Sequence, residues 1–388
     1  MFDQNKVIQE FIRREKEIKE DQEELENRDV DYPQLIRDLE LMSEVEFRSL
    51  LGDEPLVEPI EFNQPFIRQI CDCKSKEELN SWAIKTVKGA CLSAVDGSQI
   101  NPSKELSCVI GLVQAGYFGI EYPKTFDQEH PDAANIDYDV KPKLLIGRDG
   151  KVIPGSLSEG DVALYRQSME IDYSKERIQA IKSNDLENLL LIDGTLIYSF
   201  MKSLNPITMR DMIDQLVTLL KESEESKVFL AGYIDTSYAK DLCTVLHALH
   251  KIEEVPFSDA GILKPFLAKM GSYTIPFIVR RDPMSEYGEY KNKMCFSYAR
   301  INSKRPVRIE FPRWIWDMGF YEKFMALITG SAIFGAGYPH VLIRAHELAV
   351  LKGNSRELFK NLALYLLNDK MNLGIEEMVK QKLKHSFS

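Results

Sequence analysis

Short apolar runs bounded by turn residues recur along this chain from residue 86 onward, and two of them end in the same way. Residues 91–96 and 189–193 are nearly continuous apolar stretches that finish in aspartate, and each aspartate is followed by glycine and a hydroxyl residue. Runs of this kind predict buried β-strands, and the Asp-Gly pairs predict a sharp turn at the end of each strand.

The remaining pattern alternates between strand-like and helix-like segments. Residues 105–122 predict one long strand or two short ones, residues 121–142 an acidic loop, and residues 143–153 a hairpin. Helical spacing occurs at 158–182, 207–223 and 339–352, and further strands are predicted at 227–237, 275–281, 293–301 and 306–312. A hairpin-rich start followed by strand–helix alternation indicates an α/β fold with a mixed β-sheet flanked by helices.

The N-terminal part has a different pattern. Residues 1–50 are rich in charged side chains with apolar positions at helical spacing, which predicts one or two exposed helices. Such a segment is either an oligomerisation or partner-binding arm or a solvated helical face with no dedicated role. Residues 51–66 contain several prolines and are interpreted as a connection. We therefore expect a helical N-terminal extension at 1–85 and a second domain at 86–388.

Composition narrows the class of protein. The chain has a formal net charge of −11, which argues against a protein that coats nucleic acid through a general positive field. It does not exclude a nucleic-acid enzyme with a local basic track. No apolar stretch is long enough to span a membrane, and the charged N-terminus has no signal core. The six cysteines form no regular framework, so we expect a cytoplasmic protein with reduced thiols.

The aspartates at the two strand ends also suggest a metal-binding site. An aspartate at the end of a buried strand is costly unless a partner or a metal supports its charge, although Asp-Gly is also ordinary turn chemistry. Adjacent strands could bring Asp96 and Asp193 together. Hard divalent cations such as Mn²⁺ or Mg²⁺ prefer oxygen ligands, and two such ions can promote hydrolysis of a phosphodiester. The pattern predicts a metal-dependent hydrolase with about two ions.

Other candidate ligands are less specific. Glu170 lies in a predicted helix, but it follows Arg166 by four residues, a spacing that suits a surface ion pair. Asp172 is a weaker candidate in the same helix. Asp235 ends a third predicted strand, where the Asp-Thr-Ser sequence also suits a helix cap.

The sequence lacks the motifs that several other classes of hydrolase require. The segment around Asp193 resembles the nucleophile loop of haloacid-dehalogenase phosphatases, but Leu191 stands where the nucleophilic aspartate belongs. No Gly-x-Ser-x-Gly or Cys/His pattern points to a serine or cysteine hydrolase. His247 and His250 have no evident Cys or Asp partner and are interpreted as structural.

An ordered set of segments resembles the NurA family of DNA repair nucleases, whose members have an RNase H-like core. The matching segments are AVDGSQI, RQSMEIDYS, LLIDGTLI, LAGYIDTS, VRIEFP and GYPHVLIRAHELAVLKG, which together span residues 90–352. The resemblance implies an RNase H-like, manganese- or magnesium-dependent nuclease that degrades DNA ends 5′ to 3′ and cuts single strands. It also implies a hexameric HerA translocase as partner in end resection, and a homodimer.

The resemblance assigns roles to individual residues. It implies that Asp96, Glu170 and Asp193 are catalytic metal ligands and that His346 is the late catalytic histidine. Asp235 stands where a basic residue is expected, as a fourth ligand or a neutral replacement. The family's catalytic tyrosine is left open among Tyr233, Tyr273 and Tyr298, which all end or line predicted strands.

A basic stretch offers a path for DNA. Between residues 280 and 313 the sequence has nine Lys and Arg residues but only four acidic residues, and aromatic residues are interleaved with them. Positive grooves with aromatic faces hold single strands without base specificity. The candidate DNA-binding residues are Arg300, Arg305, Arg308, Arg313 and Tyr298. The same pattern also fits an edge strand protected by charge, with its aromatic residues in the core or in a dimer contact.

Two other functions stay open. The chain could be an inactive RNase H-like scaffold that partners a translocase, although its intact acids argue against this. A metal-dependent phosphatase is also open, but the basic aromatic stretch favours a polymeric substrate.

Overall fold

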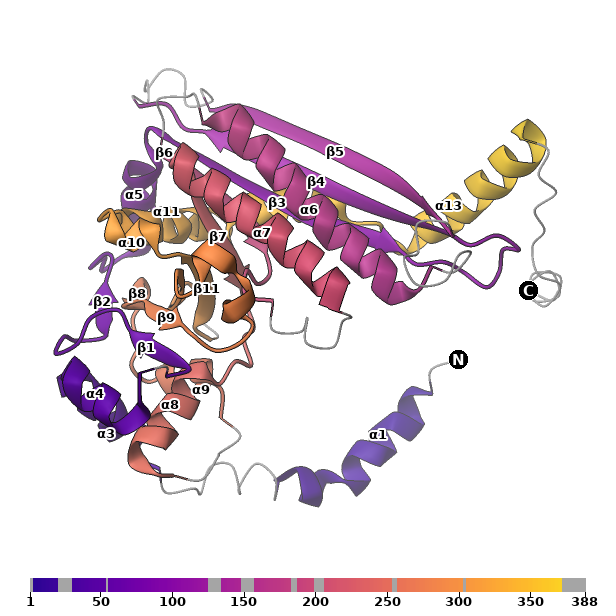
Figure 1. Cartoon of the computed structure of the whole chain (residues 1–388). Coiled ribbons are helices and arrows are strands. Elements are labelled where there is room, and N and C mark those ends of the chain that lie inside the picture. The colour runs from indigo at the N-terminus through magenta and orange to yellow at the C-terminus, as the bar shows by residue number, and fades with distance from the viewer. Residues whose placement is uncertain are drawn as a thin grey trace.

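One large mixed β-sheet forms the centre of the molecule (Figure 1). The structure, a computed structural model, describes residues 3–19, 30–53, 55–124, 134–147, 157–182, 187–198, 206–252, 257–302 and 305–371. The strand order is β1 (Val57–Pro59), β9 (Phe277–Val279), β10 (Met294–Ala299), β11 (Val307–Pro312), β7 (Phe229–Ile234), β6 (Glu187–Asp193), β3 (Ala90–Ile100), β4 (Ile110–Glu121) and β5 (Asn135–Ile146). Off this path, β8 (Ser272–Thr274) pairs with β10 and with β2 (Ile67–Gln69).

The direction of the strands defines where a site can form. Strands β3, β6 and β7 run parallel. On one side β4 pairs antiparallel with β3, and β5 pairs antiparallel with β4; on the other side β11 pairs antiparallel with β7. In the register of the parallel strands Val95 lies opposite Ile192, and Ile192 lies opposite Gly232. Strands β6 and β7 end at one edge of the sheet, where ligands of such sheets commonly bind. The prediction of a sharp turn after Asp96 is wrong, because β3 continues past Asp96 to Ile100, whereas β6 ends at Asp193 as predicted.

Helices cover both faces of the sheet (Figure 1). One face carries α6 (Glu159–Ile181) and α7 (Pro206–Ser226), and the other carries α5 (Lys76–Val87), α11 (Tyr321–Phe334) and α12 (His340–Ala349), with the short α10 (Trp314–Asp317) preceding α11. Alternation along β3 divides the buried side chains between two cores: Val95 packs with α6 and α7, and Ala94 packs with α11 and α12. The site thus lies between two helical layers.

A smaller helical group packs at the β1 end of the molecule. It consists of α3 (Tyr32–Leu41), α4 (Glu44–Leu51), α8 (Asp241–His250) and α9 (Asp259–Leu263). Two short 3₁₀-helices, Met284–Glu286 and Gly288–Tyr290, lie in the segment before β10.

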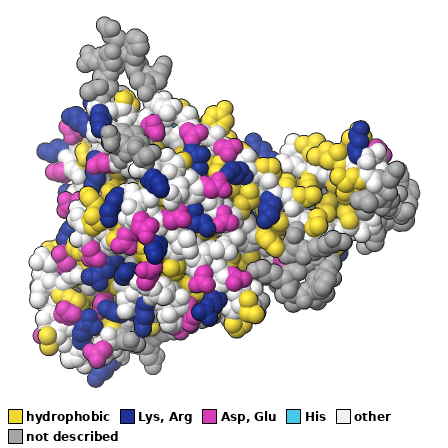
Figure 2. All heavy atoms as spheres, turned by 45° about the horizontal axis from the view of Figure 1, so that its top comes forward, with side chains coloured by type: hydrophobic (Ala, Val, Ile, Leu, Met, Phe, Trp, Pro, Cys, Tyr) yellow, Lys and Arg dark blue, Asp and Glu magenta, His cyan; other side chains and the backbone are white. Residues whose placement is uncertain are grey.

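The two terminal helices project away from the sheet (Figure 1). Helix α1 (Gln4–Arg13) buries none of its residues. Helix α13 (Gly353–Tyr365) continues into a π-helical turn at Leu366–Lys370 and exposes apolar side chains. Figure 2 shows hydrophobic side chains gathered toward one end of the visible face, while acidic and basic side chains intermingle over the rest.

The predicted α/β fold with a mixed sheet is confirmed, with differences in detail. β4 is one continuous strand, and β5 begins at Asn135 inside the predicted acidic loop. The expected hairpin turn falls at residues 148–150, outside the described residues. The N-terminal segment contributes more than helices, because β1 and β2 join the sheet. None of the described helices is long and apolar enough to cross a membrane.

Candidate active site

Three aspartates converge at the C-terminal edge of the parallel strands. Asp193 is the last residue of β6, and Asp96 in β3 follows Val95, which pairs with the residue before Asp193. Asp235 follows the last residue of β7. Asp96 is 7% exposed, whereas Asp193 and Asp235 are open to solvent. The register alone therefore brings together carboxylates that are far apart in sequence.

Glu170 reaches the same edge from helix α6. Its side chain is buried and forms an ion pair with Arg166 one turn earlier. Arg166 also donates to Gln99 Oε1 at 3.2 Å, which fixes the pair against β3. A side chain at Gly97 would place its Cβ 2.1 Å from Glu170 Oε1, so glycine is required for the glutamate to lie against the strand. The ion pair expected from the spacing is present, but it lies inside the site rather than on a free surface.

Helix α12 brings His346 to Asp96. The Nδ1 atom of His346 lies 2.7 Å from Asp96 Oδ2. The helix can approach the sheet because Gly116, the partner of Asp96 on β4, has no side chain; a Cβ there would lie 2.7 Å from the Ala349 nitrogen. Ser98 then accepts a hydrogen bond from the backbone N–H of Leu351 at 3.2 Å. The hydroxyl after Asp96-Gly97 thus anchors the segment that follows α12.

Two tyrosines lie against Asp193. The Tyr338 hydroxyl donates to Asp193 Oδ1 at 3.1 Å, and its ring packs edge-on against Tyr233 with 5.0 Å between centroids. Among the described residues the buried Tyr233 hydroxyl has no hydrogen-bond partner. Of the tyrosines left open by the sequence, Tyr273 and Tyr298 lie elsewhere, the latter against Asp259. Tyr338, which the sequence reasoning missed, directly contacts a candidate ligand.

The carboxyl groups shift one another's pKa values through electrostatic repulsion. Desolvation raises the pKa of the Glu170 carboxyl to about 7; Arg166 opposes the shift, and the charges of Asp96 and Asp193 add to it. Desolvation by nearby protein atoms, together with the charge of Asp96, also raises the pKa of Asp193, although its surface is open on one side. The cluster carries more negative charge than its surroundings compensate, which is typical of a site that takes a cation.

The donor set suits a hard divalent cation in its chemistry. All four acids offer carboxylate oxygens, and the unpartnered Tyr233 hydroxyl adds a further polar atom beside Asp193. Across the described part of the chain, no three His, Cys, Asp or Glu side chains are close enough together to hold an ion as they stand. The four acids thus share one edge of the sheet without forming a closed set of ligands in this arrangement.

The predicted DNA-binding stretch divides into surface and core. Arg308 is 2% exposed, and Tyr298 is fully buried beneath it. The prediction that these two residues contact DNA is wrong, because β10 and β11 are buried along their whole length and acidic residues hold Arg308 in the core. Arg300 and Arg313 are half-buried and Arg305 is exposed.

The turn before β11 connects this stretch to the carboxylates. Asn302 donates through Nδ2 to Asp235 Oδ1 at 3.2 Å. Gly337, next to Tyr338, lies so close to Asn302 that a Cβ there would be 3.0 Å from the Asn302 Cβ. Arg305 therefore stands on a turn that borders the same edge of the sheet as Asp193 and Asp235.

These features define a class of protein: an α/β protein with a mixed sheet flanked by helices and with acids at the C-terminal edge of its parallel strands. A sequence model of the NurA domain matches residues 92–351, and the chain therefore belongs to the NurA family. No protein of curated function matches the chain significantly.

Solved structures that match the chain have low sequence identity to it and low TM-scores. A crystal structure of NurA has 12% sequence identity and a TM-score of 0.40, covering 70% of this chain and 88% of that one. Endonuclease V from Ciona intestinalis has 10% identity and a TM-score of 0.28, covering 75% and 100% of the two chains. Argonaute from Aquifex aeolicus has 8% identity and a TM-score of 0.24, covering 67% and 28%.

Proposed function

We propose that this protein is a divalent-metal-dependent deoxyribonuclease that hydrolyses phosphodiester bonds. The observation that carries the proposal is the convergence of Asp96, Glu170 and Asp193, from two strands and a helix, at one edge of the sheet. Membership of a nuclease family supports it independently.

Mn²⁺ or Mg²⁺ would be held by Asp96, Glu170 and Asp193, with Asp235 as a further candidate. Two such ions supply activation of water and stabilisation of the leaving oxygen. Glu170 has one carboxylate oxygen committed to Arg166 and Asp193 has one committed to Tyr338, so each keeps a second oxygen for a ligand. Arg166 limits the repulsion among the acids in the free protein.

His346 is the candidate for moving a proton. With Asp96 ionised, the hydrogen bond to Oδ2 places the proton of a neutral imidazole on Nδ1, which leaves Nε2 as an acceptor. The side chain is 59% exposed, so Nε2 can accept a proton from water or contact a phosphate.

Tyr338 is a hydrogen-bond donor rather than a base. Desolvation and the neighbouring charge of Asp193 raise the pKa of its hydroxyl well above the ordinary value, so the proton stays on the oxygen. The hydroxyl orients Asp193 and stabilises its charged form.

DNA would approach along the turn that precedes β11. Arg305 is exposed there, and Asn302 links the turn to Asp235. Arg300 and Arg313 are the other basic candidates that remain outside the core. Phosphate contacts from such residues would position the strand without reading its sequence.

The finer activity rests on the family resemblance. We propose 5′-to-3′ degradation of DNA ends, cleavage of single strands, and a role in end resection and double-strand break repair with a HerA-type translocase. We also propose a homodimer. The exposed apolar positions Leu358, Leu362 and Tyr365, spaced to form one stripe on α13, are the kind of surface that assembly buries.

The test is manganese-dependent cleavage of 5′-labelled single-stranded and blunt duplex DNA by the native chain and by Asp193→Asn. The matched control is Asp172→Asn, because Asp172, the weaker candidate in the helix that carries Glu170, has an exposed side chain that pairs with Lys175. We expect the native chain and the control to cut and Asp193→Asn to be inactive. Equal cutting by all three would place the chemistry elsewhere, and no cutting with or without a HerA-type partner would favour an inactive scaffold.

A further inference from the structure

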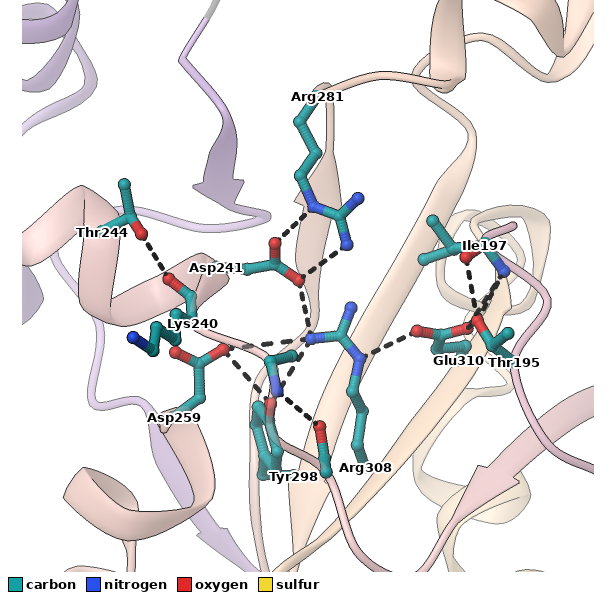
Figure 3. A network of polar contacts seen from close by, with 12 residues as sticks. Thr195, Ile197, Lys240, Asp241, Thr244, Asp259, Arg281, Tyr298, Arg308 and Glu310 are labelled. Carbon is teal, nitrogen blue, oxygen red and sulfur yellow. Dashed lines mark hydrogen bonds and ion pairs between the residues drawn. The ribbon is translucent and has the colours of Figure 1, made fainter. Parts of the chain in front are cut away.

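Strand β11 carries a buried carboxylate that the proposed chemistry does not use. Glu310 is 3% exposed and lies opposite Gly232 on β7. Its Oε2 atom accepts hydrogen bonds from Thr195 Oγ1 at 2.6 Å, from the Leu196 nitrogen at 2.8 Å and from the Ile197 nitrogen at 3.1 Å (Figure 3). One carboxylate oxygen thus holds the loop that directly follows Asp193.

The loop is shaped to lie against the sheet at this point. Gly194 has a φ of +133°, which favours glycine, and its N–H donates to the Tyr233 carbonyl at 3.1 Å. A Cβ on Gly232 would lie 2.5 Å from the Gly194 oxygen, so the absence of a side chain there leaves room for the loop. The turn after Asp193 therefore packs in a defined position, between β7 and the Glu310 carboxylate.

A series of buried ion pairs holds the other oxygen of the Glu310 carboxylate. Arg308 Nε donates to Glu310 Oε1 at 2.8 Å, and Arg308 Nη1 lies 2.9 Å from Asp241 Oδ2 (Figure 3). Arg281 pairs with the other side of Asp241, and Asp259 lies 3.9 Å from Arg308 Nη1. Burial would raise the pKa of Asp241, but the two arginines outweigh it and keep that pKa below its ordinary value. The loop is thus tied through Glu310 to the start of helix α8.

We infer that Glu310 is a positioning residue for Asp193: it fixes the Gly194–Ile197 loop, and Arg308 and Asp241 fix Glu310. This inference rests on the proposed function, because it assigns Glu310 to the same site. Glu310 does not contact the reacting atoms. It acts by limiting how far the loop, and with it the Asp193 carboxylate, can move when a cation binds.

The test compares Glu310→Gln with Glu58→Gln. Glu58 is a matched control because it is equally buried, lies on an outer strand of the same sheet and is paired with two arginines, Arg48 and Arg280. Hydrogen exchange of the Leu196 and Ile197 amides is measured without metal, and cleavage is measured over a range of Mn²⁺ concentrations. Thr195→Val, which removes one donor to Glu310, is the second variant if Glu310→Gln does not fold.

In Glu310→Gln we expect the two amides to exchange at least tenfold faster, and the Mn²⁺ concentration for half-maximal cleavage to rise about tenfold. Glu58→Gln should leave both at the native values. Unchanged exchange, or faster exchange with an unchanged Mn²⁺ requirement, would overturn the inference alone. Absence of Mn²⁺-dependent cleavage in the native chain would instead overturn the proposed function, and the inference with it.

Discussion

The hydroxyl of Tyr338 donates a hydrogen bond to Asp193 Oδ1 across 3.1 Å, and the two residues are 145 positions apart in sequence. The contact joins the end of β6 to the residue that precedes Pro339 and helix α12. It therefore links two elements that carry the candidate site: the strand of Asp193 and the helix of His346.

Tyr338→Phe should separate this hydrogen bond from packing. The variant keeps the ring against Tyr233 but loses the donor to Asp193, so we expect DNA cleavage to fall about tenfold or more with little change in melting temperature. Initial rates and thermal unfolding measure the two effects. Tyr365→Phe, a half-exposed tyrosine on α13, is the control and should cut at the native rate. An active Tyr338→Phe would contradict the assigned role.

Stability without metal should depend on the protonation of Glu170. Its pKa is about 7 in the folded protein, compared with 4.5 ordinarily, so between these values the folded state binds more protons than the unfolded state. The free energy of unfolding should therefore decrease as pH rises from about 4.5 to 7, by on the order of 1–3 kcal/mol from this group.

Glu170→Gln lacks this titration. In chelator, denaturant unfolding from pH 4.5 to 7 should show the native chain losing stability relative to Glu170→Gln as pH rises. Added Mn²⁺ should reduce the loss in the native chain only. Parallel stability curves in chelator would mean that Glu170 is not held in a desolvated, acidic cluster.

Gly97→Ala should displace Glu170. The new Cβ would lie 2.1 Å from Glu170 Oε1 and 2.9 Å from Arg166 Cγ, so the ion pair must move. We expect a loss of about 1–3 kcal/mol in unfolding free energy and a larger proportional loss of cleavage. Gly160→Ala, in the first turn of the same helix, has no atom closer than 3.6 Å and serves as the control for adding a methyl group. Native activity in Gly97→Ala would refute this placement of Glu170.

Arg305 and Arg308 should behave in opposite ways despite their proximity in sequence. Arg308→Ala leaves Asp241 and Glu310 without their buried partner and should cost about 3–5 kcal/mol of stability. Arg305→Ala should leave stability within about 0.5 kcal/mol but weaken binding to single-stranded DNA and reduce its salt dependence. Fluorescence anisotropy at several salt concentrations measures binding. Unchanged affinity in Arg305→Ala would remove the turn from the DNA path.

The regular elements were predictable from the sequence because their signals are local. The helix expected at 158–182 is α6, and the apolar runs before Asp96 and Asp193 are β3 and β6. The first half of β5 was missed although Ile136, Tyr138 and Val140 alternate with polar residues, because the acidic residues and prolines around them suggested a loop. Most of these residues are exposed, since β5 lies at an outer edge of the sheet. β1 and β2 were missed because each has only three residues, and their pairing with β9 and β8 is a tertiary contact.

The site was predictable as far as its acids but not its surroundings. Asp96 and Asp193 follow from the strand pattern, whereas Glu170 required the family resemblance, because its spacing from Arg166 also fits a surface pair. Tyr338 lies in the matching segment GYPHVLIRAHELAVLKG, before a helix-starting proline, but its sequence position does not show that its hydroxyl reaches Asp193. The burial of Arg308 could have been suspected, since Arg308 and Glu310 share one face of a strand whose other face is apolar.

Binding of Mn²⁺ at the edge that carries Asp96 and Asp193 can be measured by calorimetric titration into the metal-free protein, comparing the native chain with Asp96→Asn, Asp193→Asn and Asp172→Asn. Since Asp96 and Asp193 are proposed to share one metal site, each of the first two variants should lower Mn²⁺ affinity at least tenfold while staying folded. Asp172→Asn should bind as the native chain does. Native Mn²⁺ affinity in both Asp96→Asn and Asp193→Asn would contradict the account.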